Sequence, residues 1–258
     1  MSNENPNPLL VGWSILRAMR VRKPRPSGTA VVEHDALSEI LDVLAESGVP
    51  GLASQRVRIA EYVADLATVD PDHLSRNDAL AFWLNLYNAG ALELAAETSA
   101  QGAPSVLRVP GGFSRAWVNI AGEDLSLDDI EHGKLRRFGD PRIHGALVCG
   151  SASCPTLRYE PYTGSTVDRQ LDDQMRAFLA GGGVHYNEGS QRLELSRIFK
   201  WYGADFVRPH RMPSWIPPSK SAVAAAIERW LDPELRDVAD RAAIRFQSYD
   251  WTLACSIA

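Results

Sequence analysis

The 258-residue sequence has few cysteines, no long apolar run and no excess of positive charge. Three cysteines in a chain of this length do not make a disulfide scaffold, and their scarcity favours a reducing, cytoplasmic setting. No run of about 18 apolar residues exists, so no membrane-spanning helix is expected. The net charge of −5 argues against general nucleic-acid binding. The sequence also lacks a phosphate-binding glycine loop, a Gly-x-Ser-x-Gly elbow and a His-Glu-x-x-His helix, so the familiar enzyme classes that use them have no support.

The sequence does contain enough hydrophobic residues, 45%, to bury a full core. Its periodicity predicts an α+β fold with a small mixed or antiparallel sheet packed on a buried central helix. Residues 1–29 are expected to form a basic arm and linker, and residues 30–258 a single α+β domain. Helices are expected over residues 36–45, 55–66, 80–92, 127–138, 167–179, 198–206 and 222–231. Strands are expected over residues 116–120, 123–127, 143–149, 184–186, 193–195 and 244–247.

The N-terminal arm combines apolar and basic residues. Leu9 to Met19 is apolar apart from Arg17, and four basic residues follow it, at positions 20, 22, 23 and 25. A signal peptide places its charge before the apolar stretch, so this order is wrong for one. The segment is expected to be mobile or to fold back on the domain. The alternative is a short helix that contacts an anionic membrane surface or a protein partner.

The helix expected over residues 80–92 is apolar nearly all round, which is typical of a central, buried helix. It nevertheless carries Asn85 and Asn88, which share one face of the helix. An unpaired amide in a core costs roughly 1–3 kcal/mol. Both side chains must therefore have partners, either the backbone of a neighbouring loop or the polar groups of a substrate site.

The stretch from Arg142 to Pro155 contains two of the three cysteines, Cys149 and Cys154, and one of six histidines, His144. Its apolar first half predicts a buried strand, and its small residues predict a tight loop that leaves the strand. Such a loop can direct several backbone N–H groups into one concavity. A strand, two thiols, an imidazole and this loop are what a nucleophilic or redox site needs.

The histidines near the thiols are the candidate bases. His144 and Cys149 are five residues apart, so on a regular strand their side chains point to opposite faces. His132 lies on the preceding expected helix, where a neighbouring Glu131 would diverge from it if the helix were regular. A zinc site made of His132, His144 and both thiols has no spacing rule behind it, so no metal and no cofactor is expected.

Several blocks of this sequence resemble one known family. They run in matching order from about Ser75 to Phe206, and we take residues 75–206 as the core of the resemblance. The blocks are Phe82–Ala89, Ile130–His132, Asp140–His144, Cys149–Pro155 and Phe199–Tyr202. They resemble the signatures of domain-of-unknown-function family 547, which has no established activity.

Members of that family look distantly similar to transglutaminase-like and papain-like thiol hydrolases. The resemblance implies a papain-like or transglutaminase-like core with extra helices, in which a helix carries the cysteine and a strand carries the histidine. His144 resembles that histidine. The expected helix over residues 80–92 has no cysteine, so the nucleophile would have to come from the loop, as Cys149 or Cys154.

Three hypotheses follow. The first is a thiol-dependent hydrolase or acyltransferase acting on a small-molecule or peptide substrate. Its candidate catalytic residues are Cys154, Cys149, His132, His144 and Glu131. Its candidate substrate-binding residues are Asn85, Asn88, Gly150, Ser151 and Ser153, with the backbone N–H groups of residues 150–154 holding the oxyanion. The second is a non-catalytic binding module for a small molecule or peptide, and the third is a thiol–disulfide redox protein, which requires the two Cα atoms to lie within roughly 7 Å.

Overall fold

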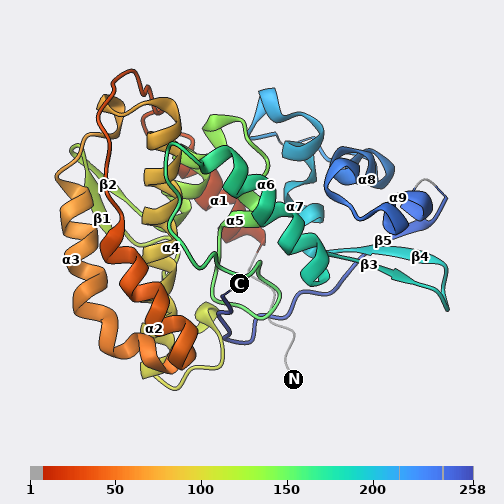
Figure 1. Ribbon diagram of the computed structural model, residues 1–258, viewed down its shortest axis with the longest axis horizontal. Coiled ribbons are helices and arrows are strands. Elements are labelled where there is room, and N and C mark those ends of the chain that lie inside the picture. Colours follow the sequence, from red (N-terminus) through yellow and green to blue (C-terminus); the bar gives the residue numbers. More distant parts are fainter. Residues whose placement is uncertain (1–7, 215, 240, 258) are drawn as a thin grey trace.

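The computed structural model describes residues 8–214, 216–239 and 241–257 and shows a mixture of helix and sheet, as expected for the α+β class (Figure 1). The helices are α1 (Pro8–Ala18), α2 (Asp35–Leu52), α3 (Arg56–Ala67), α4 (Arg76–Ala100), α5 (Ile143–Ala146), α6 (Val167–Phe178), α7 (Arg197–Val207), α8 (Lys220–Ile227) and α9 (Pro233–Ala239). The strands are β1 (Val118–Ile120), β2 (Glu123–Leu125), β3 (Val184–Asn187), β4 (Arg192–Leu195) and β5 (Ala243–Phe246). A π-helical segment, η4 (Asp129–Lys134), continues into a 3-10 turn, η5 (Leu135–Phe138).

Helix α4 is the buried centre of the larger core, as its sequence predicts. Ser75 begins it, because its hydroxyl oxygen accepts a hydrogen bond from the backbone N–H of Asp78 at 3.2 Å. Every residue from Ala79 to Leu92 is buried. The helix extends to Ala100, beyond the end expected at residue 92. Glu93 and Glu97 interrupt the apolar pattern of residues 80–92, because they give the last turns of the helix a polar side. Helices α2 and α3, which include most of the helices expected over residues 36–45 and 55–66, pack on α4 through their buried apolar residues.

Four of the expected strands, over residues 116–120, 123–127, 184–186 and 193–195, form two hairpins. Strands β1 and β2 pair antiparallel, with Ile120 opposite Glu123. Both turn residues between them, Ala121 and Gly122, have positive φ (50° and 82°), as a tight two-residue turn requires. Strands β3 and β4 also pair antiparallel, and β5 adds to β4 in parallel, which makes a mixed three-stranded sheet.

The three-stranded sheet lies at a distance from α4 (Figure 1). It packs against α7 and α8, and a second apolar cluster fills this part of the chain. The β1–β2 hairpin instead lies beside α3, and Trp117 just before it contacts Gly90 of α4. The expected sheet on the central helix is therefore divided into two small sheets in different places.

Helix α1 folds back on the molecule, which is one of the two arrangements expected of the arm. It packs on η4, where Ala18 is fully buried, and Arg17 forms an ion pair with Asp129 at 2.8 Å. In the described part of the chain, no helix has both the length and the apolar character needed to cross a membrane.

Candidate functional site

The segment before the thiol loop is a helical turn, and the strand expected over residues 143–149 is wrong. Asp140 starts the turn, since its carboxylate accepts the backbone N–H of Arg142 at 3.0 Å. Helix α5 follows and ends at Ala146. A short apolar run does not by itself distinguish a buried strand from a buried helical turn, which is why the sequence misleads here.

The backbone beyond α5 is bonded to a side chain of α4, where a strand would have a neighbouring strand. The amide nitrogen of Asn88 donates to the carbonyl of Ala146 at 3.1 Å, and its amide oxygen accepts the N–H of Val148 at 3.1 Å. Asn85 makes the same two bonds with Tyr162: its amide nitrogen donates to the carbonyl at 2.8 Å, and its amide oxygen accepts the backbone N–H at 2.9 Å. Of the two roles expected for these amides, their contacts show loop anchoring. The cavity beside both has a volume of about 10 Å³, room for no more than a water molecule.

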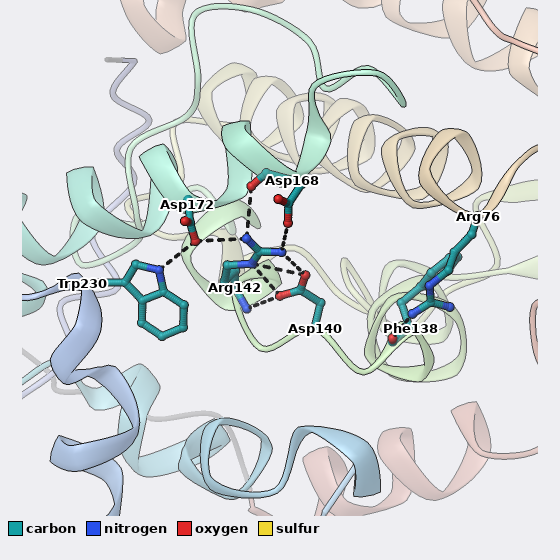
Figure 2. Close-up of polar contacts among 7 residues, drawn as sticks. All are labelled: Arg76, Phe138, Asp140, Arg142, Asp168, Asp172 and Trp230. Carbon is teal, nitrogen blue, oxygen red and sulfur yellow. Dashed lines mark hydrogen bonds and ion pairs between the residues drawn. The ribbon is translucent and has the colours of Figure 1, made fainter.

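Arg142 fixes α5 to α6 (Figure 2). Its guanidinium contacts the carboxylates of Asp140 and Asp168, both at 2.7 Å, and of Asp172 at 3.0 Å. Asp172 also accepts the indole N–H of Trp230 at 2.9 Å. Burial alone would raise the pKa of Asp172, but the bonds from Trp230 and Arg142 lower it. The cluster therefore locks the entry to the thiol loop against two other parts of the chain.

The two thiols of the loop form a disulfide, Cys149–Cys154, with the Cα atoms 6.3 Å apart. Both cysteines are half-buried. The sulfur of Cys154 accepts the backbone N–H of Cys149 at 2.9 Å. The hydroxyl of Ser151 lies 3.0 Å from the sulfur of Cys149, and the hydroxyl of Tyr249 lies 3.2 Å from each sulfur. We call these three donors, the Cys149 N–H and the Ser151 and Tyr249 hydroxyls, the sulfur cage.

Tyr249 is suited to donate a hydrogen bond in this cage. Its hydroxyl also lies 3.0 Å from that of Ser151. Burial raises the pKa of Tyr249 to about 12, and the negative charge of Glu131 contributes to the rise, whereas the bond with Ser151 opposes it. The phenol therefore keeps its proton at neutral pH and can give it to a sulfur.

The loop itself is held by the C-terminal segment, residues 249–257, which runs back beside it (Figure 1). Ala152 donates to the carbonyl of Thr252 at 2.9 Å, and Ser153 donates to that of Asp250 at 3.2 Å. The N–H of Cys154 is bonded to Ser151 at 3.0 Å. These three N–H groups have acceptors, so the expected oxyanion site built from residues 150–154 is wrong for them.

Gly150 and Ser153 take part in the same anchoring. Gly150 has φ +74°, a conformation that favours glycine, and its carbonyl accepts the N–H of Ala254 at 3.2 Å. The hydroxyl of Ser153 accepts the N–H of Asp250 at 2.9 Å. The small residues of the loop thus serve its close approach to the C-terminal segment.

A buried charged cluster surrounds His144. Its Nε2 lies 2.9 Å from a carboxylate oxygen of Asp205, which also accepts two bonds from Arg136 at 2.7 and 3.0 Å. Burial alone would raise the pKa of Asp205, but the bonds from His144 and Arg136 hold it well below its usual value. The ring of Tyr202 stacks on His144 with the centroids 4.0 Å apart.

Glu131 and His132 lie in the same cluster, and their side chains do not diverge as they would in a regular helix. The backbone of η4 is π-helical, so its side chains do not follow α-helical spacing, and the Glu131 carboxylate lies 3.6 Å from Nδ1 of His132. Tyr87 donates to Glu131 at 3.2 Å. Burial lowers the pKa of His132 to about 4, although Glu131 opposes the shift, so this imidazole is neutral at pH 7.

The histidines and the sulfurs are near neighbours in the sequence but are not joined in the structure. Among the described residues, neither His132 nor His144 forms a hydrogen bond with Cys149 or Cys154. The clusters are connected indirectly. Trp201 lies against Tyr249 with the ring centroids 4.8 Å apart, Tyr202 follows it in α7, and Glu131 acts electrostatically on Tyr249.

Sequence reasoning missed Asp205, Arg136, Tyr202 and Tyr249. Asp205 carried a usable signal, because it is a charge between apolar residues near the end of α7 and needs a buried partner, as the asparagines of α4 do. Arg136 gave none, because it lies among other basic residues. Tyr249 gave no such signal. In the described residues, no group of three or more histidine, cysteine, aspartate or glutamate side chains is arranged to hold a metal ion.

A separate polar cleft of about 870 Å³ lies between the start of α2, the start of α4 and the start of α6. It is lined by residues of the ranges 31–38, 75–78 and 160–170. None of the site residues expected from the sequence lines it.

Comparison with known proteins agrees with the resemblance seen in the sequence. Residues 71–179 match the family "Protein of unknown function, DUF547". The matched segment covers less than half of the chain and includes α4, η4, α5, the thiol loop and α6. It excludes Tyr202, Asp205 and Tyr249, so the partners of the loop and of His144 come from outside the matched segment. No curated protein and no solved structure matches this chain.

Proposed function

We propose that the protein is a thiol–disulfide redox protein in which Cys149 and Cys154 alternate between a disulfide and a dithiol. The observation that carries the proposal is the pairing of these cysteines inside the sulfur cage, at a Cα separation of 6.3 Å. The pair is half-buried, so a substrate disulfide or a low-molecular-weight thiol can approach it. In a cytoplasmic setting, which we propose with it, a disulfide is transient and catalytic.

Cys154 is the attacking residue in this proposal. In the dithiol form its sulfur would keep the N–H of Cys149 and the hydroxyl of Tyr249 as donors, and donors to sulfur stabilise the thiolate. The thiolate attacks a substrate disulfide, so a mixed disulfide forms and the first substrate sulfur leaves as a thiolate. The thiolate of Cys149 then attacks the sulfur of Cys154. This step restores the Cys149–Cys154 bond and releases the second substrate sulfur, and a low-molecular-weight thiol reduces the pair for the next cycle.

The test is a redox titration of the full chain. The protein is equilibrated with mixtures of reduced and oxidised glutathione, free thiols are alkylated, and the mass gain reports the dithiol fraction. A redox-active pair is expected to have a midpoint above about −300 mV, whereas a purely structural disulfide lies below it. Cys149→Ser is expected to accumulate a mixed disulfide at Cys154, and Cys154→Ser to lose exchange. Cys255→Ser is the matched control, since burial raises the pKa of Cys255 to about 12. A pair that no mixture reduces would contradict the redox role and favour the non-catalytic binding module.

A second candidate, also our proposal, is the thiol hydrolase or acyltransferase, in the dithiol form. The hydrogen bond between His144 and Asp205 favours it, because an imidazole oriented by a carboxylate is the base of such enzymes. It requires the distant similarity to papain-like proteins to extend to chemistry. Incubation of the dithiol protein with an activated ester distinguishes the two candidates. A covalent acyl adduct on one cysteine that is lost in His144→Gln and retained in His185→Gln would support acyl transfer. The absence of any adduct would contradict acyl transfer and favour the redox proposal.

A further inference from the structure

The N-terminal segment presents a largely exposed apolar face, formed by Trp13 and Leu16 of α1 and by Met19 just after it, whose sulfur contacts the guanidinium of Arg137. Trp13, Leu16 and Met19 follow one another at three-residue spacing and are 62%, 58% and 37% exposed. Among the described residues, these are three of the eight large hydrophobic side chains on the surface. A contiguous exposed apolar group of this kind marks an interaction surface.

The opposite face of α1 is firmly seated, so the apolar face is not the result of a detached helix. Ser14 donates to Asp128, and Arg17 contacts Asp129 and Ser126 at 2.8 and 2.7 Å. A Cβ added to Gly133 would lie 2.7 Å from the carbonyl oxygen of Ala18, which shows how closely the helix lies against η4. The helix therefore packs on the protein through one side and exposes its apolar side to a binding partner.

The charges that follow the helix indicate the kind of partner that its exposed side binds. The chain has a net charge of −5, yet residues 17–25 contain five basic residues and no acidic one. Arg17 and Arg22 are paired with carboxylates. Among the described residues, the side chains of Arg20, Lys23 and Arg25 form no ion pair, and all three are exposed. Aromatic and aliphatic side chains beside unpaired cations are the features of a helix that lies in the surface of an anionic bilayer.

We propose that α1 and the basic residues after it dock the protein on an anionic phospholipid membrane. Trp13, Leu16 and Met19 enter the boundary between headgroups and acyl chains, and Arg20, Lys23 and Arg25 contact the phosphate groups. This inference is independent of the thiol chemistry proposed above, since it uses none of the residues of the loop or of the His144 cluster.

Co-sedimentation of the full chain with lipid vesicles tests the proposal. Binding is expected to vesicles that contain phosphatidylglycerol and to be at least tenfold weaker to vesicles of phosphatidylcholine alone. It is also expected to weaken in about 1 M salt, where the Debye length is roughly 3 Å. Each basic side chain removed is expected to lower the affinity roughly fivefold, as found for basic residues near anionic membranes.

Two pairs of variants make the test specific. Trp13→Ser with Leu16→Ser is expected to abolish binding, whereas Val57→Ser with Ile216→Ser, also exposed apolar positions, leaves it unchanged. Arg20→Ala with Lys23→Ala is expected to weaken binding, whereas Arg56→Ala with Arg192→Ala does not. Circular dichroism of each variant checks folding. Equal binding to both kinds of vesicle, or none, would overturn the proposal. A concentration-dependent dimer lost in the Trp13/Leu16 variant would assign the face to a second copy of the chain instead.

Discussion

Asp205 lies 2.9 Å from Nε2 of His144, a residue 61 positions earlier in the chain, and the same carboxylate holds Arg136. Asp205 is fully buried and joins α7 to α5 and η5 at one point. The side chains of His144 and Arg136 thus share one carboxylate as a hydrogen-bond partner. Removing one partner of a buried ion pair leaves the other uncompensated, which is far more costly than replacing both.

We therefore expect Asp205→Ala to lower the free energy of unfolding by about 3–5 kcal/mol. Urea denaturation followed by circular dichroism measures the change. Asp173→Asn, an exposed position on α6, is the control and is expected to change it by less than about 0.5 kcal/mol. An Asp205→Ala protein with unaltered stability would show that His144 and Arg136 find other partners.

Asn88→Ala is expected to cost about 2–4 kcal/mol, because it leaves the carbonyl of Ala146 and the N–H of Val148 buried without a partner. Native-state hydrogen exchange should show the loss of protection at Val148 before any global change. Asn77→Ala, an exposed site in the first turn of the same helix, controls for the loss of an amide. If Val148 remained protected in the Asn88 variant, the anchoring role of this side chain would be excluded.

Stability is expected to fall as the pH drops from about 6.5 towards 4. Burial lowers the pKa of both His34 and His132 from 6.5 to about 4. The unfolded chain takes up these protons near pH 6.5 while the folded chain does not, so the free energy of unfolding decreases as the pH falls through this window and is unaffected above it. Urea midpoints across this range measure the slope, and His34→Gln is expected to reduce it. An unchanged slope in His34→Gln would contradict the lowered pKa of His34.

Tyr249→Phe is expected to raise the pKa of the Cys154 thiol in the dithiol protein, since it removes one donor from the sulfur cage. The rate of alkylation of Cys154 in the dithiol protein, followed against pH by mass spectrometry, gives this value. The same variant should make the reduction potential more negative, because the dithiol form loses a stabilising bond. Tyr186→Phe is the control. Equal alkylation–pH profiles for the unsubstituted protein and both variants would rule out a role for the Tyr249 hydroxyl.

Arg142→Lys is expected to destabilise the protein by about 1–2 kcal/mol, because lysine cannot contact three carboxylates at once. Most of the effect should come from Asp140, whose side chain is 19% exposed, since Asp168 is 84% exposed and well screened. Thermal unfolding at low and high salt measures it. Arg58→Lys, in an exposed ion pair with Glu39, should change the stability little. A similar loss of stability in both variants would show that the Arg142 cluster stabilises the fold no more than a surface ion pair does.

Sequence reasoning succeeded where a feature is set by local pattern. The buried α4 and the two strands on either side of Ala121-Gly122 each follow from residues within a few positions of one another. The need of Asn85 and Asn88 for partners was also predictable, because the cost of an unpaired buried amide does not depend on the fold. What those partners were could not be predicted, since Tyr162 lies 77 residues from Asn85.

The candidate site was located only in part, for the same reason. Its chemically capable residues were recognised in the block from Glu131 to Cys154, but Asp205 and Tyr249 come from distant segments and are brought in by tertiary packing. The strand expected over residues 143–149 failed because the hydrogen-bonding capacity of that backbone is met by a side chain of α4. The π-helical form of η4, which lets Glu131 approach His132, has no signature in the sequence.

Tyr249 lies 100 residues after Cys149, and the backbone that holds the thiol loop follows it. At a synthesis rate of about 5–20 residues per second, the two cysteines exist for roughly 5–20 s on the ribosome before these groups are made. Any oxidation of the nascent chain during that interval would take place without the donors that distinguish the sulfurs in the finished protein. The chemistry of the pair is thus acquired late, when the end of the chain folds over it.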